Sequence, residues 1–292
     1  MAGKAEKPLV ESLAVLVPPE RVWAALTSPR DLGQLLLGRV EMGAQPGARL
    51  VWHWGVWEKL APGRRRYTWE GTVLEVVPGS TLVLGPAELP RGKRGGGPDP
   101  PPVVTLTVKG QRGAALVTVV QGAPARPGEK LEDYKHGWAD FLLKLKTQLE
   151  TENLEGEVWC RALVRATPAQ VYRAWLSPAA LAKLLPGKAK VQAKVGGRFS
   201  WRHKLGKHEH TGAFLELKKN RGINFTWETT DPASEVALEA QPAPYGTLVS
   251  VHHTGLLGMN RGQLFGQRMF WRRLLERLRC YCAFKGKIKT AG

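Results

Sequence analysis

Pro19-Glu20-Arg21-Val22-Trp23-Ala24-Ala25-Leu26-Thr27-Ser28-Pro29-Arg30-Asp31-Leu32 returns later in the chain as Pro168-Ala169-Gln170-Val171-Tyr172-Arg173-Ala174-Trp175-Leu176-Ser177-Pro178-Ala179-Ala180-Leu181. The spacing is 149 residues at every position, and Pro, Val, an aromatic residue, Ala, Ser-Pro and Leu recur in register. Each copy follows an apolar, β-prone run and precedes an Arg-apolar-x-Trp segment. A repeat of this length indicates two copies of one domain.

Around this phrase the first copy predicts a strand, two short helices, more strands and a long closing helix. Pro19 suits the first turn of a short helix over 20–26. Ser28-Pro29 ends that helix, and Ser28 or Asp31 caps a second one over 31–37. Apolar side chains spaced by three and four predict the closing helix over about 129–149. The predicted strands are 9–17, 49–57, 67–77, 81–84, 103–109 and 115–121.

The second copy repeats this order with shorter loops. The offset between matching segments falls from 149 to 141 and then to 132 residues, and length differences confined to loops fit a true repeat. Residues 85–102, with six Pro and five Gly, form a long irregular loop in the first copy. We expect one domain over 8–150 and a second over 156–286. The second copy's predicted elements are a strand over 156–166, helices over 168–176 and 178–185, and a closing helix over 262–284. Between them, segments 197–201, 211–216, 223–228 and 248–251 match strands of the first copy.

Composition favours an ordinary globular protein. Apolar residues make up 43% of the 292 residues, enough for a normal core in each half. The first residues lack the apolar core of a signal peptide, and no apolar run is long enough to span a bilayer. We therefore expect a cytoplasmic protein without a membrane span. Cys160, Cys280 and Cys282 form no C-x-x-C pair, which argues against a disulfide scaffold or a zinc knuckle.

The net charge of +18 is uneven: residues 1–152 carry 20 Lys/Arg and 16 Asp/Glu, and residues 153–292 carry 23 and 9. Such a field attracts polyanions non-specifically, but charge alone does not predict specific nucleic-acid binding. Arg268, Arg272 and Arg279 fall on one stripe of the closing helix. We interpret this stripe as a basic, solvent-facing surface. An anionic partner or an acidic ligand is the alternative.

The combined motifs resemble the START-like, or SRPBCC, helix-grip superfamily. The second copy, with "ATPAQVYRAWLSP", "VGGRFSW", "TGAFLEL", "INFTWE" and "YGTLVSVHHTG", is similar to the branch named after the heat-shock-protein-90 ATPase activator homologue. The resemblance implies an α+β fold of two tandem helix-grip domains. Each domain would be an antiparallel sheet wrapped around a long C-terminal helix, with two short helices after the first strand. It also implies a cavity between sheet and closing helix that holds an apolar small molecule.

Strand alternation and the implied cavity give a set of ligand-cavity candidates, which plain core packing would explain equally. His252 and His253 are adjacent on one strand and must face opposite sides, but the sequence does not show which side is the cavity. Glu75 and Glu216 match between copies and could serve as acids or lie on the outer face. The candidates are Trp52, Trp54, Trp69, Trp138, Trp201, His203, Phe214, Trp227, His252 and Phe270.

We identify no catalytic residue. The chain lacks the short motifs of nucleotide enzymes, serine hydrolases and metalloproteases. The histidines near 203–210 match no metal-ligand spacing, so we expect neither a metal site nor a cofactor. The expected function is binding of an apolar or amphipathic small molecule. The alternatives are a polyketide cyclase/aromatase-like enzyme, and a co-chaperone-like or polyanion-binding protein that uses the basic second domain.

Overall fold

The computed structural model describes residues 8–60, 68–86, 103–111, 113–122, 131–152, 154–185, 187–203, 209–228 and 233–287. The chain divides into two compact units: Met1–Gly55 with Arg66–Glu150, and Thr151–Gly292 with Val56–Arg65. Residues 87–102 of the long loop, His208 and the start of the closing helix near 129 lie outside the described residues.

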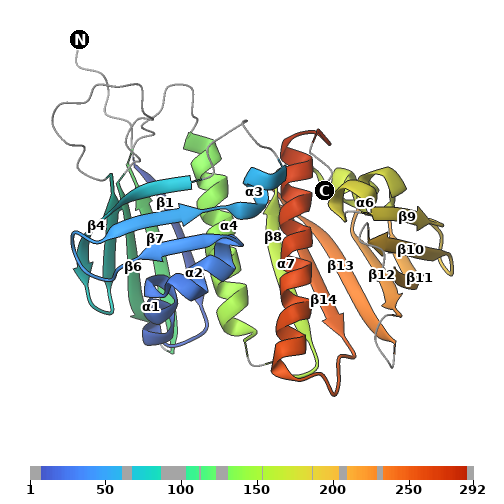
Figure 1. Cartoon of the computed structure of the whole chain (residues 1–292), viewed down its shortest axis with the longest axis horizontal. Helices are drawn as coiled ribbons and strands as arrows, with labels where there is room; N and C mark the ends of the chain where they lie inside the picture. The colour runs from blue at the N-terminus through green and yellow to red at the C-terminus, as the bar shows by residue number, and fades with distance from the viewer. Residues whose placement is uncertain are drawn as a thin grey trace, which may run out of the picture. The chain divides into compact units, whose positions relative to one another are not determined.

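In the first unit the described chain folds as a strand, two short helices, six further strands and a closing helix (Figure 1). The elements are β1 (Leu9–Val15), α1 (Pro19–Thr27), α2 (Pro29–Leu36), β2 (Arg39–Met42), β3 (Arg49–His53), α3 (Gly55–Leu60), β4 (Thr68–Val77), β5 (Thr81–Gly85), β6 (Val104–Gln111), β7 (Ala114–Gln121) and α4 (Leu131–Glu150). Of these, α3 from Val56 onward is grouped with the second unit.

The second unit repeats the order of strands and helices, apart from α3. Its elements are β8 (Val158–Val164), α5 (Pro168–Leu176), α6 (Pro178–Leu184), β9 (Gly187–Val191), β10 (Arg198–His203), β11 (Glu209–Lys218), β12 (Gly222–Trp227), β13 (Ser234–Ala243), β14 (Gly246–Thr254) and α7 (Arg261–Ala283).

Both units have the same sheet topology. The strand orders are β1-β7-β6-β5-β4-β3-β2 and β8-β14-β13-β12-β11-β10-β9, with every neighbouring pair antiparallel. The closing helices α4 and α7 run along their own sheets and pack against β1 and β8, respectively (Figure 1). These observations confirm the expected α+β fold of two tandem helix-grip domains.

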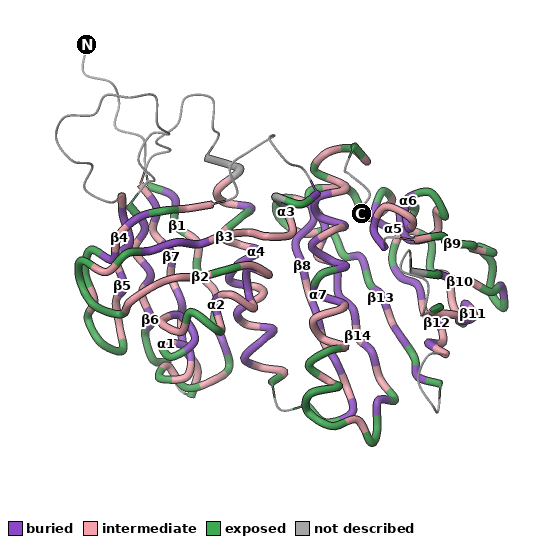
Figure 2. Tube along the Cα trace, viewed as in Figure 1, coloured by how far each residue is buried: buried purple, intermediate pink, exposed green. Residues whose placement is uncertain are grey.

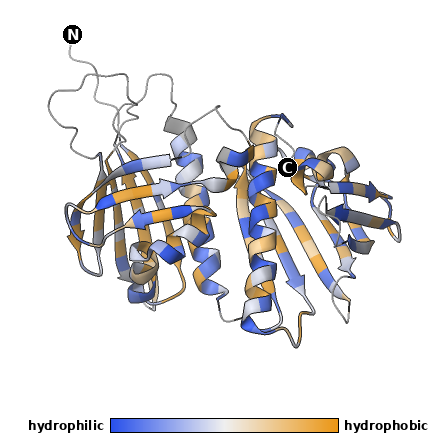
Figure 3. Ribbon diagram, in the orientation of Figure 1, coloured by the Kyte–Doolittle hydropathy of each residue, from blue (hydrophilic) through white to orange (hydrophobic). Residues whose placement is uncertain are grey.

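Period-two alternation builds each core. Along the strands, buried residues alternate with more exposed ones (Figure 2), and apolar residues follow the same pattern (Figure 3). Strand β7, for example, buries every second side chain, including Val117 and Val119. The inward faces and the apolar side of the closing helix therefore make one core in each unit. No helix in the described part of the chain is long and apolar enough to cross a membrane.

The repeat extends to a β-bulge that the sequence did not predict. The pairing of β4 with β5 shifts between Val73 and Glu75, and that of β11 with β12 shifts between Phe214 and Glu216. In each case the extra residue is an exposed leucine, Leu74 or Leu215. Because bulges bend and twist the strand that carries them, both sheets curve at the same position around their core.

The strand predicted over 49–57 was too long, because the chain leaves the sheet after His53 and turns into α3. The edge strands β2 and β9 and the inner strand β13 were not predicted. The two edge strands are short, and β9 exposes Lys188 and Lys190. Such charges keep edge strands from pairing with other chains, and they also hide the strand from an apolar-pattern search.

Candidate functional site

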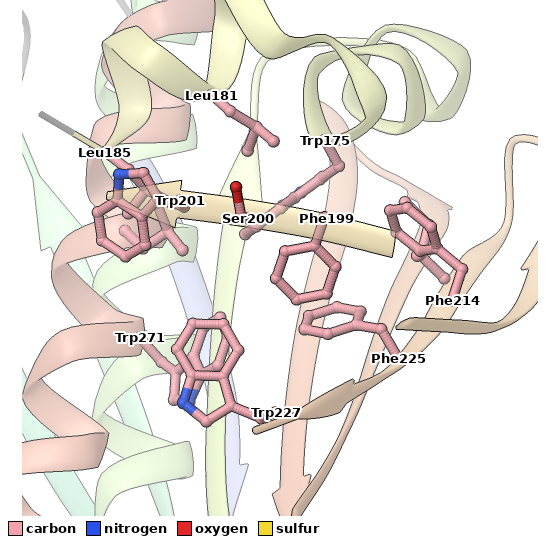
Figure 4. A pocket seen from close by; sticks show the side chains of 12 residues that line it. Trp175, Leu181, Leu185, Phe199, Ser200, Trp201, Phe214, Phe225, Trp227 and Trp271 are labelled. Atoms are coloured by element: carbon pink, nitrogen blue, oxygen red, sulfur yellow. The ribbon is translucent and has the colours of Figure 1, made fainter. Parts of the chain in front are cut away.

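A cavity of about 40 Å³ lies in the second unit, between the inner face of the sheet, the short helices and α7 (Figure 4). Its walls are almost wholly apolar, and seven of the lining residues are Trp or Phe. One water molecule needs ~10–15 Å³ in such a measure, so the space suits about three waters or a small ring. The lining residues are Trp175, Leu181, Leu185, Phe199, Ser200, Trp201, Phe214, Ile223, Phe225, Trp227, Trp271 and Leu274.

Well-capped short helices place Trp175 and Leu181 over the cavity. Helix α5 begins with a capping box in which Thr167 accepts from the N–H of Gln170 and the Gln170 side chain accepts from that of Thr167. Ser177 caps α6 in the same way as Ser28 caps α2. A cap at the start of each helix, Thr167 for α5 and Ser177 for α6, fixes the direction of both helices. The repeated Ser-Pro phrase therefore positions the roof of the cavity.

Arg277 fastens this roof to α7. Its guanidinium donates to the carbonyl oxygens of Leu184 and Lys183, with 3.0 Å between Nη2 and the Lys183 oxygen. Those carbonyls end α6 and have no partner within the helix. Burial lowers the pKa of Arg277 from its ordinary value. The arginine thus supplies a C-terminal cap from a neighbouring element.

Aromatic rings in contact form most of the wall on the sheet side. The ring centres of Trp227 and Trp271 are 5.2 Å apart, and those of Phe199 and Phe225 are 5.3 Å apart and edge to face. His210 stacks between two of the tryptophans, at 4.9 Å from Trp201 and 4.5 Å from Trp227. Aromatic pairs at these distances add attraction beyond area burial, so the wall is stiff.

Behind the wall lies a buried polar network centred on His253, which is 0% exposed. The indole N–H of Trp271 donates to His253 Nδ1 at 3.0 Å, and His253 Nε2 lies 2.7 Å from Ser234 Oγ. The hydroxyl of Ser234 donates to the carbonyl oxygen of Trp227 at 3.3 Å. Since Nδ1 accepts, the neutral ring carries its proton on Nε2 and donates it to Ser234. Burial, with a smaller effect of His252, lowers the pKa of His253 to about 4.

His252 faces the other way. Its Nε2 lies 2.9 Å from a carboxylate oxygen of Glu157, and its ring stacks on Trp159 at 3.8 Å. The hydrogen bond to His252 is the main reason that the pKa of Glu157 is lowered. His252 was therefore the wrong choice between the two adjacent histidines, because its neighbour faces the core.

Of the other second-copy candidates, Trp201, Phe214 and Trp227 line the cavity. Phe270 is one layer removed: it contacts Trp201 at 5.7 Å and Trp271 at 5.0 Å between ring centres. His203 ends β10, but its side chain lies outside the described part of the structure. Among the residues described, no group of three or more His, Cys, Asp or Glu is arranged to hold a metal ion.

The first-copy candidates form one cluster in the core of the first unit. Trp52 is fully buried. Its ring lies 5.1 Å from Trp69, 6.3 Å from Trp54 and 6.4 Å from Trp138. Trp138 Nε1 donates to Gln121 Oε1 at 2.6 Å. In the register of the repeat Gln121 stands where His253 stands, so the same bond links closing helix and sheet in both units.

Two expectations about charged residues also change. Arg272 and Arg279 are only 9% and 8% exposed, and Arg268 is half-buried, so this stripe is not a basic solvent face. Arg279 Nε donates to the Leu163 carbonyl at 3.0 Å, because α7 packs against β8 on this side.

The matched glutamates next to the bulges do not reach the cavity. Glu75 is exposed, and Glu216 accepts from Asn224 Nδ2 at 3.1 Å and pairs with Lys218 at 3.0 Å. The interpretation as outer-face residues therefore fits both glutamates.

Sequence reasoning missed Trp175, Phe225 and Trp271. Two of these residues could have been found by comparing the copies, because Trp175 and Phe225 stand where the first copy has Leu26 and Leu84. Ring side chains at these two positions distinguish the interior of the second copy from that of the first.

Comparisons with known proteins show the family of this chain. The family profile described as "Activator of Hsp90 ATPase homolog 1-like protein" matches residues 16–150 and again 165–283. The comparison with curated proteins gives no significant match.

Solved structures of similar proteins include DynU16, from the dynemicin biosynthetic locus (20% identity, 96% of this chain and 99% of that one, TM-score 0.40). They also include the di-domain ARO/CYC BexL from the BE-7585A biosynthetic pathway (16%, 95% and 99%, 0.40). A third is the Aha1 dimer from Colwellia psychrerythraea (16%, 45% and 98%, 0.41). The two profile matches cover most of the chain, which therefore belongs to the activator of Hsp90 ATPase homolog 1-like family, in two tandem copies.

Proposed function

We propose that the second domain binds a small apolar molecule in the cavity beneath α5 and α6. The cavity wall is the observation that carries this proposal: among twelve lining residues, Ser200 alone is neither aliphatic nor aromatic. An apolar cavity offers water no hydrogen bonds, so it stays dry and takes up apolar molecules of matching size. Burial of ligand carbon contributes about 25 cal/mol per Å².

Size limits the ligand class. Sites that enclose drug-sized ligands measure ~300–1,000 Å³, much more than the 40 Å³ found here. The unliganded cavity therefore suits a single ring or a short chain. Larger molecules enter only if α6 or α7 moves away from the sheet. The ring-lined walls favour aromatic guests, which gain edge-to-face contacts with Phe199, Phe225 and Trp227.

The cyclase-like alternative requires a group that transfers protons within the cavity. None of the lining residues is His, Tyr, Arg, Asp or Glu. Both ring nitrogens of the neighbouring His253 are hydrogen-bonded to protein side chains, Ser234 and Trp271. The polyanion alternative relied on the basic second domain. Within its α7 arginine stripe, Arg272 and Arg279 are buried and Arg268 is half-buried, so this stripe adds little to a polyanion surface. Ligand storage or transfer, without chemistry on the ligand, is the function that these walls support best.

Native mass spectrometry of the purified protein tests for a co-purifying small molecule. Titration with toluene, a single-ring apolar probe whose binding is followed by the indole ¹H–¹⁵N signals of the wall tryptophans, tests the site itself. The variant Leu274→Phe introduces the residue that the first domain has in its matching position, Phe141, and fills part of the cavity. We expect it to weaken probe binding by about tenfold, while the reciprocal change Phe141→Leu leaves binding at the wild-type level. Equal probe affinity in wild type and Leu274→Phe would place the probe elsewhere and refute the proposal.

A further inference from the structure

We infer that His253 is a positioning residue that lowers the affinity of the cavity for ligands that carry a hydrogen-bond acceptor. It does so by holding the indole N–H of Trp271, a wall residue, in a bond directed away from the ligand. This inference rests on the proposed binding function. It adds a specificity-determining residue that does not itself touch the cavity.

The geometry supports this role. Trp271 is 1% exposed and lines the cavity, and its Nε1 lies 3.0 Å from His253 Nδ1. With the N–H occupied, the indole offers a ligand only carbon and the π-face. The second ring nitrogen of His253 is bonded to Ser234, which is 1% exposed, at 2.7 Å. The imidazole is thus held from both sides and cannot turn away from Trp271.

The network also spans the wall. His253 lies on β14, Ser234 begins β13, Trp227 ends β12, and Trp271 lies on α7. The bond from the Ser234 hydroxyl to the Trp227 carbonyl continues the chain from one wall tryptophan to another. Fully satisfied buried networks of this kind rigidify what they connect. Loss of His253 therefore affects both tryptophans, but only Trp271 gains a free donor.

The first domain shows what the fold itself requires at this position. There Trp138 Nε1 donates to Gln121 Oε1, at 2.6 Å, and Gln121 is 1% exposed. An amide oxygen thus replaces the imidazole nitrogen as acceptor without change of topology. The essential property is an acceptor that reaches the indole. His253→Gln is therefore the conservative variant, and His253→Leu is the variant that removes the acceptor.

A freed indole N–H would be a buried donor without a partner, and a ligand oxygen could accept from it. A new hydrogen bond that meets a buried unpaired donor is worth roughly tenfold or more in affinity. We therefore expect His253→Leu to change ligand preference, beyond any change in overall affinity.

The test compares ethylbenzene with acetophenone, two single-ring probes of similar shape of which only the second carries a carbonyl oxygen. Their affinities are measured by titration, followed by the ¹H–¹⁵N signals of the indoles in the cavity wall. We expect the ratio of acetophenone to ethylbenzene affinity to rise about tenfold in His253→Leu and to stay at the wild-type value in His253→Gln. The ¹H–¹⁵N signal of the Trp271 indole, assigned with Trp271→Phe, should move in His253→Leu and remain near its wild-type position in His253→Gln.

An unchanged affinity ratio in His253→Leu, with both probes bound by the wild type, overturns the inference and leaves the binding function intact. Absence of any probe binding by the wild type refutes the binding function, and the inference fails with it. If His253→Leu does not fold, His253→Val takes its place, because valine also removes the acceptor of the Trp271 N–H. The expected rise in the ratio is the same.

Discussion

The indole N–H of Trp271 donates to Nδ1 of His253 at 3.0 Å, in the interior of the second domain. This bond requires an unprotonated Nδ1, so it fixes the neutral tautomer of the histidine. The matching pair in the first domain is Trp138 and Gln121, at 2.6 Å. Gln121 does not titrate. The two domains thus use the same link between closing helix and sheet, but only one of them responds to pH.

The first prediction concerns the pH dependence of stability. Burial lowers the pKa of His253 from 6.5 to about 4 in the folded protein. Between these two values the unfolded chain binds a proton that the folded chain does not, so unfolding becomes easier as pH falls. The free energy of unfolding keeps its full value, as far as His253 is concerned, above pH 6.5. It decreases by about 3 kcal/mol as the pH falls from 6.5 to 4. Urea unfolding at pH 7.5 and pH 4.5 should show this loss in the wild type, and a smaller loss in His253→Gln. Equal losses in both proteins would contradict the assignment.

Two glycines give opposite predictions. A Cβ on Gly212 would lie 1.9 Å from the carbonyl oxygen of Thr226 and 2.6 Å from the Phe199 ring. Gly212→Ala should therefore destabilise the protein by about 1–3 kcal/mol. Gly266 lies within α7 and is exposed, and a Cβ added there would meet no atom within 4 Å apart from its chain neighbours and the backbone of its own helix. Gly266→Ala should stabilise by about 1 kcal/mol. The midpoints of urea unfolding measure both changes, and the same sign for both would show that the helix or the strand packs differently.

Much of the fold could be predicted because the helix-pair phrase carries its own signals. Helix α5 has the predicted bounds, since Pro168 starts it and Ser177-Pro178 ends it. The edge strand β9 was missed because its outward Lys188 and Lys190 leave little apolar pattern. A short polar strand is recognisable only from its partner, here β10.

The cavity could be predicted only in part. Adjacent histidines are ambiguous until the pairing of β14 is known, and it is the pairing of His253 with Val158 and Val236 that fixes its inward side. Whether a core leaves free space depends on side-chain volumes on several elements at once. Leu274 is smaller than Phe141, the residue at the matching position of the first domain. No local sequence pattern shows whether neighbouring side chains fill the volume that the smaller side chain leaves.

Arg277 gives a third prediction. Its guanidinium bonds to the Lys183 and Leu184 carbonyls at the end of α6. Arg277→Met keeps most of the aliphatic stem but removes the donors, leaving the two carbonyls without their cap. We expect a loss of about 1–3 kcal/mol in the free energy of unfolding, and weaker probe binding because the roof over the cavity loosens. Arg273→Met, on the exposed side of α7, is the matched control and should change neither quantity. A loss as large in the control would assign the effect to net charge.

The cysteines report on the interior of the second domain. Burial raises the pKa of Cys160 and of Cys282 to about 12, and Cys280 is 0% exposed. Since the thiolate is the reactive form, these thiols should react with 5,5′-dithiobis(2-nitrobenzoate) at pH 8 far more slowly in the folded protein than in guanidinium chloride, where all three become accessible.

Cys160 Sγ lies 3.6 Å from the carbonyl oxygen of Arg268, on the side of α7 that faces β8. Its labelling therefore requires α7 to separate from the sheet, so the rate of Cys160 modification measures how often that helix opens. A saturating ligand in the cavity should slow this rate further, and a Cys160 as reactive in folded as in unfolded protein would show that α7 does not close the domain.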